Sequence, residues 1–562
     1  MSDVRRPPVP PREPGPAPPA DRNEGAPVTS SSRPAHTIPG SVPETRSRRA
    51  VLGAAALTAA GALALPAAAH AAPAGRGHGD GHGGGHGHGP GRGHGPGHGH
   101  GHGTRGRFLT EDLATGGDGV FPNYRIPALV QLNNGDILAA YDGRPTGTDS
   151  PGPNSVLQRR STDGGVTWGE QTVIEQGKEG EEKEGYSDPS YVYDRITGTL
   201  FNFHVFSKDT GFFDSGYGND DADRRVQSTT VSVSTDDGRT WTSKRLTKVT
   251  KPEDVRGMFA TSGAGIQLTR GRHRGRLVQQ YIGQWRDESF RSYSVYSDDH
   301  GRTWTMGEPV GIAMDENKVV ELSDGTLMLN SRIHAGGTAR FVALSRDGGE
   351  SWSEPVLDAT LTDPRNNASV IAMNPGARKR SAKAKELLFS NSNSANERVN
   401  GSIRYSYDDG ETWPVVKSYQ AGDHAYSQLA ALEDGTFGVL FEGEDSNQIV
   451  FGRFDRAWLN PFRLHVRTTR ATVDAGGSVE LRVRIRNDDE RALPAGTASA
   501  SLPTGWEAES VHLPALRPGH SASLRLSVSA PADVDPGTVL GDVTVEAGDF
   551  SLRGDLVVSV RG

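Results

Sequence analysis

One eight-residue pattern, Ser-x-Asp-x-Gly-x-Thr/Ser-Trp, occurs five times and constrains the fold more than any other feature of the chain. The Asp can accept hydrogen bonds from the backbone amides that follow it, the Gly supplies a positive φ, and the Thr or Ser ties the turn across. Each copy therefore predicts a β-hairpin turn with a Trp packed beneath it. The copies, called Asp boxes below, are Ser161–Trp168, Ser234–Trp241, Ser297–Trp304, Ser345–Trp352 and Ser406–Trp413.

The segments around the Asp boxes are short β-branched and aromatic runs separated by Gly, Asp and Asn, with almost no helical periodicity. A second hairpin signal repeats at Asn134–Leu138, Ser323–Leu327 and Glu433–Phe437. The intervals between boxes fit sheets of about four strands. We therefore expect residues 107–460 to form an all-β, six-bladed β-propeller, in which the boxes are scaffold. Five boxes do not count the blades, because a blade can lack one.

The sequence before this region falls into three segments of different composition, at residues 1–45, 46–72 and 73–106. Residues 1–45 are rich in Pro, Arg, Ser and Glu, which predicts disorder. Residues 46–72 carry Arg48-Arg49, an Ala/Leu/Gly run and then Ala69-His70-Ala71, which together predict a twin-arginine secretory signal. A membrane anchor is the alternative, although the apolar run is barely long enough to span a bilayer. We expect a secreted, extracellular protein without membrane attachment after signal cleavage.

Residues 73–106 alternate Gly with His and Pro, and we expect a flexible linker there. Histidines at this density could instead bind a transition metal. The chain has no cysteine, so no disulfide stabilises it, which fits export in the folded state. The net charge of −8 argues against nucleic acid as a partner.

After Trp458 the boxes stop and residues 461–562 show the two-residue alternation of half-buried strands. About seven short strands in 100 residues are typical of an immunoglobulin-like β-sandwich. The segment resembles the accessory β-sandwich found beside bacterial glycosidase domains, and we expect a spacer or stabilising role here rather than carbohydrate binding.

A short motif, Asn123-Tyr124-Arg125-Ile126-Pro127, stands before an apolar strand and ahead of all the boxes. In this combination the sequence resembles the bacterial exo-sialidases (neuraminidases) of glycoside hydrolase family 33, of the secreted actinobacterial type, over about residues 108–460. The resemblance implies an exo-α-sialidase that removes terminal sialic acid from glycoproteins, glycolipids and oligosaccharides. It implies no cofactor and no metal, sialylated glycans as partners, and we expect a monomer.

Sialidases of this family hold the substrate carboxylate with three arginines, because a guanidinium binds a carboxylate through two parallel hydrogen bonds. By resemblance Arg125 is the first, Arg332 the second and Arg398 the third. Arg404, on the following predicted strand, is the alternative to Arg398.

The resemblance also assigns the nucleophile. A carboxylate nucleophile would be repelled by the carboxylate of the substrate, and sialidases use tyrosine instead. Tyr426 matches that tyrosine. A phenol has an ordinary pKa of about 10 and needs a neighbouring base. Glu316 matches the base, with Glu321 as the nearby alternative.

The remaining catalytic role is an acid that protonates the departing oxygen and then activates water. Asp149, in a loop rich in Gly and Pro, matches this acid, and Asp142 is the alternative. Arg144, Asp188 and Asp315 match positions that line the substrate pocket of the family. The implied mechanism passes through a tyrosyl-enzyme intermediate with net retention of configuration.

Two functions other than hydrolysis are alternatives at the level of the sequence. A trans-sialidase would use the same residues while protecting the intermediate from water. A non-catalytic lectin for sialic acid would be expected to have lost Tyr426, Glu316 or Asp149, and all three are present.

Overall fold

The computed structural model describes residues 106–562, except for 335, 444–445, 460–463, 490, 549 and 562. The predictions of a disordered segment at 1–45 and a signal at 46–72, and almost all of the linker at 73–106, lie outside the described residues. The described chain is all-β, as expected, and its helical segments are single turns: α1 (Thr247–Thr250), η1 (Lys383–Lys385) and α2 (Arg456–Leu459). No helix among the described residues is long and apolar enough to cross a membrane.

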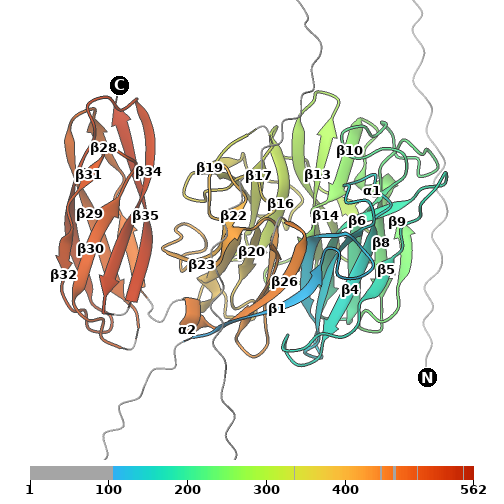
Figure 1. Ribbon diagram of the computed structural model, residues 1–562, viewed down its shortest axis with the longest axis horizontal. Coiled ribbons are helices and arrows are strands. Elements are labelled where there is room, and N and C mark those ends of the chain that lie inside the picture. The colour runs from blue at the N-terminus through green and yellow to red at the C-terminus, as the bar shows by residue number, and fades with distance from the viewer. Residues whose placement is uncertain are drawn as a thin grey trace, which may run out of the picture. The chain divides into compact units, whose positions relative to one another are not determined.

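Residues 108–454 form six sheets of four or five strands (Figure 1), and β11 joins the second sheet although the earlier strand β10 belongs to the third. The first sheet contains β2 (Asn123–Gln131), β3 (Ile137–Arg144), β4 (Ser155–Ser161) and β5 (Thr172–Glu175). The second contains β6 (Gly185–Asp194), β7 (Thr199–Ser207), β8 (Ser228–Ser234), β9 (Thr242–Arg245) and β11 (Gly263–Ala264). The third contains β10 (Val255–Ala260), β12 (Ile266–Gln267), β13 (Leu277–Trp285), β14 (Phe290–Ser297) and β15 (Thr305–Met306).

The last three sheets repeat the antiparallel order. The fourth contains β16 (Met314–Glu321), β17 (Leu327–Ile333), β18 (Arg340–Ser345) and β19 (Val356–Asp358). The fifth contains β20 (Ser369–Ala372), β21 (Leu387–Ser392), β22 (Val399–Ser406) and β23 (Val415–Asp423). The sixth contains β24 (Ser427–Ala431), β25 (Phe437–Gly443), β26 (Gln448–Phe454) and, from the other end of this region, β1 (Phe108–Thr115).

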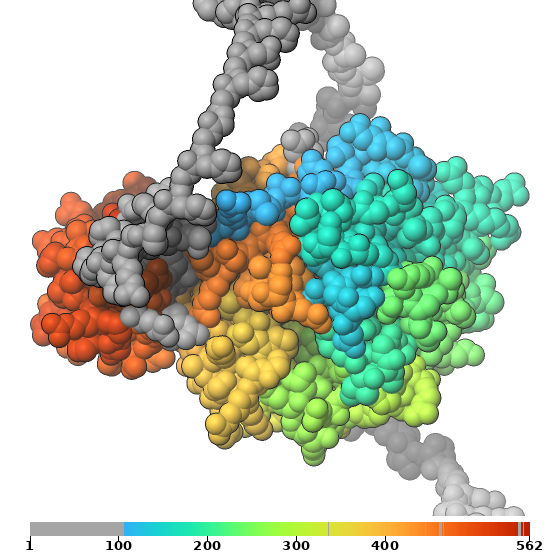
Figure 2. All heavy atoms as spheres, turned by 90° about the horizontal axis from the view of Figure 1, so that it is seen from below, coloured from blue at the N-terminus to red at the C-terminus, as the bar shows by residue number. Residues whose placement is uncertain are grey.

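The pairing of β1 with β26 brings the two ends of the region into one sheet. Phe108 pairs with Phe454 and Thr115 with Gln448, in antiparallel register. In Figure 2 the coloured segments follow one another around the visible face, so that blue and orange meet. Strand β1, whose partner β26 is distant in the sequence, thus completes the sixth sheet.

The Asp boxes form the predicted hydrogen-bonded turns. In the first box the Ser161 hydroxyl donates to Asp163 at 2.8 Å and accepts from the Gly165 amide at 2.8 Å. The Asp163 carboxylate accepts from both the amide and the hydroxyl of Thr167, at 2.9 and 2.6 Å. The Ser-to-Asp bond, the Gly-to-Ser bond and the Asp bonds to the Thr or Ser recur in the other four boxes.

Each box also contacts the sheet that precedes its own, which the sequence did not predict. Trp168, of the first sheet, packs edge-on against Phe451 of β26 at 5.0 Å between ring centroids. Trp304, of the third sheet, packs in the same way against Phe203 of β7 at 5.0 Å. The box glycines leave room for these contacts, since a Cβ at Gly301 would lie 2.1 Å from the Phe201 ring. The boxes therefore join neighbouring sheets as well as closing turns.

The C-terminal strands form two further sheets. One contains β27 (Leu464–Thr468), β29 (Ser478–Asn487), β33 (Ser521–Ser529) and β31 (Glu507–Ala508). The other contains β28 (Ala471–Asp474), β35 (Phe550–Arg561), β34 (Gly537–Ala547), β30 (Gly496–Ser501) and β32 (Val511–Leu513). Burial alternates strictly along β29, and its buried Val483 shares one hydrophobic core with Val545 and Val558 of the other sheet. Two sheets over a shared core are what the sequence alternation predicted; the immunoglobulin-like topology stays a prediction.

Candidate functional site

The candidate site lies at one end of the sheets, where the starts of some strands lie beside the ends of others. In an antiparallel pair, the start of one strand lies beside the end of the next. Arg125 and Glu316 lie at the starts of β2 and β16, whereas Arg332 lies at the end of β17. Tyr426 immediately precedes β24, and Arg398 immediately precedes β22. Residues 300 positions apart in the sequence therefore meet at one end of the sheets.

Register shifts between paired strands set the direction of these side chains. The register of β2 with β3 shifts between Arg125 and Ala128, and Ile126 between them has a φ of 66°. The register of β6 with β7 shifts in the same way around Asp188, whose φ is 61°. The register of β16 with β17 shifts between Met314 and Asn317, on either side of Glu316. A bulge bends its strand and redirects a side chain, and here three bulges coincide with predicted site residues.

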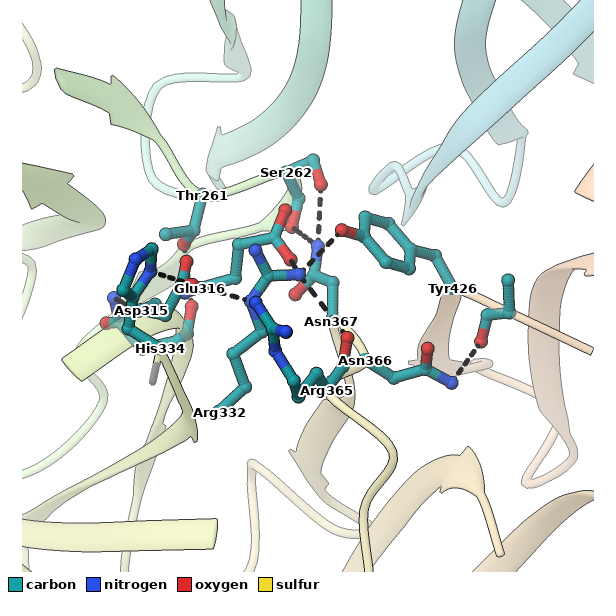
Figure 3. Close-up of polar contacts among 12 residues, drawn as sticks. Thr261, Ser262, Asp315, Glu316, Arg332, His334, Arg365, Asn366, Asn367 and Tyr426 are labelled. Atoms are coloured by element: carbon teal, nitrogen blue, oxygen red, sulfur yellow. Dashed lines mark hydrogen bonds and ion pairs between the residues drawn. The ribbon is translucent and has the colours of Figure 1, made fainter. Parts of the chain in front are cut away.

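Arg332 links the predicted nucleophile to the predicted base (Figure 3). Its Nη1 lies 2.9 Å from the Tyr426 hydroxyl and 2.7 Å from Glu316 Oε2. Its Nε lies 3.0 Å from Asp315 Oδ2. Tyr426, Glu316 and Asp315 are all almost fully buried, so this is a desolvated cluster of one cation, two carboxylates and a phenol.

The environment sets the protonation of the pair Glu316 and Tyr426. Burial raises the pKa of Glu316 above its ordinary value, while Arg332 and the Tyr426 hydroxyl act in the opposite direction. Burial also raises the pKa of Tyr426, and Arg332, Arg398 and Arg125 counteract that rise. A carboxylate with a raised pKa beside a phenol is suited to accept the phenol proton.

Asp315 differs from its neighbour Glu316. Burial would raise the pKa of Asp315, but Arg332 and a 2.9 Å contact from His334 Nδ1 lower it to about 2. Asp315 therefore stays ionised and orients Arg332.

Arg125 and Arg398 approach the ring of Tyr426 from other sheets. The guanidinium carbon of Arg125 lies 5.5 Å from the ring centroid and that of Arg398 lies 5.1 Å from it. The Nη2 of Arg398 donates to the Arg365 carbonyl at 3.0 Å. Arg404, the alternative to Arg398, is instead buried and donates to Asn393 at 2.9 Å. The structure thus gathers the three predicted arginines around one phenol.

Glu442, which no sequence motif predicted, holds Arg125 in place. Its two oxygens accept from Arg125 Nε at 2.7 Å and Nη2 at 3.1 Å. The same oxygens accept the backbone amides of Ile126 and Tyr426 at 2.7 and 3.0 Å. Although burial would raise the pKa of Glu442, Arg125 and these amides hold it below its ordinary value. A lone carboxylate in the apolar strand Phe437–Gly443 was the available signal, since a buried charge requires a partner.

Asp149 lies in the loop after β3, where its side chain is 73% exposed. Arg144 Nη2 lies 3.3 Å from Asp149 Oδ1 and 2.9 Å from Asp142 Oδ2. Asp142, the alternative acid, is fully buried, also accepts the Asp188 amide at 3.0 Å, and burial raises its pKa to about 7. Asp149 is the acid that solvent and a ligand can reach, whereas Asp142 supports Arg144 and Asp188.

Glu321, the alternative base, belongs to a different network. It pairs with Arg270 at 3.1 Å and accepts the Thr269 and Arg270 amides at 2.9 and 2.8 Å. It therefore lies at the far end of β16 from Glu316 and touches neither Tyr426 nor Arg332.

Among the described residues no group of three or more His, Cys, Asp or Glu side chains is arranged to hold a metal ion. The site offers a cluster of arginines with a phenol, a base and an exposed acid. Together the fold and this site define an all-β, Asp-box protein with an arginine cluster complementary to a small anionic ligand.

Comparison with known proteins agrees with this class. The BNR repeat-like domain matches residues 135–439, more than half of the chain. A sialidase of Micromonospora viridifaciens is 48% identical over 431 residues, which cover 76% of this chain and 66% of that protein. A sialidase of Bacteroides fragilis is 30% identical and covers 58% of this chain and 61% of that protein. The chain belongs to the sialidase family of BNR-repeat proteins.

These relatives are longer than the matched part, since the alignments span less than two thirds of their lengths. Among solved structures, the Hadza microbial sialidase Hz136 superposes with a TM-score of 0.56 at 30% identity, covering 61% of this chain and 68% of that one. An intramolecular trans-sialidase of Ruminococcus gnavus, with a TM-score of 0.54 at 22% identity over 62% of this chain and 98% of that one, shares the fold. Residues 473–548 match the NPCBM-associated, NEW3 domain of alpha-galactosidase.

Proposed function

We propose that this protein is an exo-α-sialidase that hydrolyses terminal sialic acid from glycans with retention of configuration. The observation that carries the proposal is the gathering of Arg125, Arg332 and Arg398 around Tyr426, with Glu316 beside it. Sialic acid bears a carboxylate on its anomeric carbon. Three guanidinium groups from different sheets can seat that carboxylate and so place the anomeric carbon against the phenol oxygen.

In the first step Glu316 takes the Tyr426 proton while the phenol oxygen forms a bond to the anomeric carbon. The glycosidic C–O bond breaks, and Asp149 gives its proton to the departing oxygen. In the second step Asp149 takes a proton from water, whose oxygen attacks the anomeric carbon. The bond to Tyr426 breaks and the phenol recovers its proton from Glu316. Two inversions at one carbon give net retention.

The arginines also lower the barrier to forming the phenolate. Each of them favours the charged form of Tyr426 and so opposes the effect of burial. Glu442 and Asp315 hold Arg125 and Arg332 in position before substrate binds. Preorganised charges of this kind need no reorganisation during reaction.

For the fold, we propose that the six sheets are the six blades of one closed propeller. The support is the shared sheet of β1 and β26 and the five boxes that each contact the preceding sheet.

For localisation, we propose export through the twin-arginine route, supported by Arg48-Arg49 and the apolar run after it.

Substitution of Tyr426 by Phe tests the mechanism. We expect the Tyr426→Phe variant to lose at least about 100-fold in kcat on an activated aryl sialoside, because the attacking oxygen is gone. Tyr296→Phe, which removes a hydroxyl from a tyrosine outside the site, is the matched control and should keep full activity. The product of the unmodified enzyme should appear first as the α-anomer by NMR. Full activity of Tyr426→Phe would refute the assignment.

A second assay separates hydrolysis from transfer. Purified protein is incubated with sialyllactose, with and without excess lactose, and the products are identified. Free sialic acid in both reactions supports a hydrolase, and sialylated acceptor formed at the expense of free sialic acid would identify a trans-sialidase.

A further inference from the structure

One face of the C-terminal sandwich carries five arginines whose side chains lie together on adjacent strands. Burial alternates along β29 and β33, so every second residue of each strand is on the exposed face of their sheet. The arginine face, as we call it, consists of Arg467 on β27, Arg482, Arg484 and Arg486 on β29, and Arg525 on β33.

The register places like charges opposite each other. Arg467 pairs with Arg484 across β27 and β29, and Arg482 pairs with Arg525 across β29 and β33. Directly opposed like charges on neighbouring strands destabilise a sheet. The other residues opposite these arginines on β33 are Ser521 and Ser523, which carry no compensating charge.

Three of these arginines have a carboxylate partner. Arg486 pairs with Asp488 at 2.7 Å, Arg525 with Glu480 at 3.0 Å, and Arg467 with Asp408 of the fifth Asp box at 3.8 Å. Arg482 and Arg484 form no ion pair with any described residue. The positive charge is concentrated here although the chain as a whole has a net charge of −8.

The face is also hollowed. Arg467, Arg484, Arg486 and Asp488 line a surface depression of about 260 Å³. Three guanidinium groups around one depression match the geometry of a carboxylate or sulfate group, which accepts paired hydrogen bonds. Arg482 and Arg484 are two residues apart on one strand and therefore repeat the charge at about 7 Å along it.

We propose that the arginine face binds acidic glycan chains, whose carboxylate or sulfate groups recur along a polymer. This goes beyond the proposed function, because the ligand is held by charges on the sandwich and need not be cleaved. It also revises the expectation of a mere spacer: sialidase substrates carried on acidic glycoproteins would be retained by the same chain that cleaves them.

The test compares two variants of the full chain, each lacking two exposed arginines. Arg482→Thr/Arg484→Thr removes the unpaired charges of the face, and threonine is favourable in strands. The control, Arg239→Thr/Arg302→Thr, removes two exposed arginines at the second and third Asp boxes, away from the C-terminal sandwich. Both are made in a Tyr426→Phe background for binding to immobilised sialylated mucin, to a sulfated polysaccharide without sialic acid, and to the mucin stripped of both acidic groups.

We expect Arg482→Thr/Arg484→Thr to bind the sulfated polysaccharide and the sialylated mucin at least about 5-fold more weakly, and the control to change less than about 2-fold. Binding should weaken with salt, because salt screens exposed charges. Binding to the stripped mucin should be weak in every variant. If the variant loses binding only to the sialylated mucin, the face binds carboxylate groups; if it loses binding only to the sulfated polysaccharide, the face binds sulfate groups. The melting temperature should stay equal or rise, since opposed charges are removed.

Unchanged binding in the face variant, or an equal loss in the control, would overturn the proposal. Stronger binding to phosphatidylserine vesicles or duplex DNA than to either acidic glycan would also overturn it. With Tyr426 restored, kcat/KM on a small sialoside should stay within about 2-fold in both variants. A chain that fails to cleave that sialoside would refute the proposed function alone, because the sulfated ligand tests the face without it.

Discussion

At the scale of single residues, the roles of identical side chains depend on their partners. Glu316 and Glu321 lie on one strand, yet Glu316 meets Tyr426 and Arg332, whereas Glu321 closes a network with Arg270. Asp142 and Asp149 both pair with Arg144, but only Asp149 is exposed. Residue type and motif predicted these candidates, and burial with charge distinguishes them.

Glu442 provides the sharpest test at this scale. In Glu442→Gln one of two charged acceptors for Arg125 becomes an amide donor, and the backbone amides of Ile126 and Tyr426 must share the remaining oxygen. Breaking a buried ion pair costs about 3–5 kcal/mol. We therefore expect a lower melting temperature and, because Arg125 and Tyr426 both shift, a fall of at least about 10-fold in kcat/KM on a small sialoside.

The matched control for that variant is Glu321→Gln. Glu321 is a similarly buried glutamate that also pairs with one arginine and accepts two backbone amides, away from the site. It should lose stability to a similar extent with kcat/KM unchanged in the folded fraction. Equal kinetic losses in the two variants would mean that Glu442 acts through stability only.

At the scale of elements, the Asp box is both a turn and a joint between sheets. Its conserved geometry within this chain depends on a carboxylate that accepts two or more hydrogen bonds, as Asp299 does from Thr303 and Ser297. The hydrogen bonds follow from local sequence. The partner of each box Trp, in contrast, comes from the preceding sheet.

Acid titration tests the box carboxylates. Burial raises the pKa of Asp299, but the hydrogen bonds from Thr303 and Ser297 together outweigh it and lower the pKa to about 2. Hydrogen bonds from Thr167 and Ser161 lower the pKa of Asp163 to about 2. Because an unfolded Asp has a pKa of about 3.9, this stabilisation is complete above pH 4 and is lost as the pH falls towards 2. Chemical denaturation should therefore show the free energy of unfolding falling across this range.

Asp299→Asn should be less stable than the unmodified chain at pH 6 and should show a shallower fall between pH 4 and 2. Asp254→Asn, at an exposed aspartate outside the boxes, is the control and should keep the full slope. An unchanged slope in Asp299→Asn would show that this box does not contribute to the acid response.

At the scale of the whole molecule, strand β1, from the start of the described chain, completes the sixth sheet. Leu113 of β1 is buried in a core with Leu440 and Phe451 of β25 and β26. Phe108 packs against Trp458 at 4.7 Å between ring centroids. Glu442 and Tyr426 belong to this same sheet or adjoin it, so its completion supports the site.

Two N-terminal truncations test this closure. A chain that begins at Gly106 keeps β1 and should match the full chain in melting temperature and in kcat/KM. A chain that begins at Gly117 lacks β1, exposes the edge of β26 and part of its core, and should melt several degrees lower with reduced activity. Equal stability of the two truncated chains would show that β1 does not close the region.

Much of this protein follows from its sequence. Alternating strands, turn residues and the repeated box predict an all-β protein with a two-sheet C-terminal unit, because these signals are local. The motif around Arg125 and the positions of Glu316, Arg332, Arg398 and Tyr426 predict a site by resemblance, and the structure brings those residues together. The signal, linker and oligomeric state stay predictions.

Only the tertiary structure decided the rest. That Glu442 holds Arg125, that Arg332 joins Tyr426 to Glu316, and that each box docks on the sheet before it are contacts across tens to hundreds of residues. Sequence patterns report a residue's own strand and face. They carry no information on which distant charge will meet it in a buried site, and that meeting determines both protonation and position.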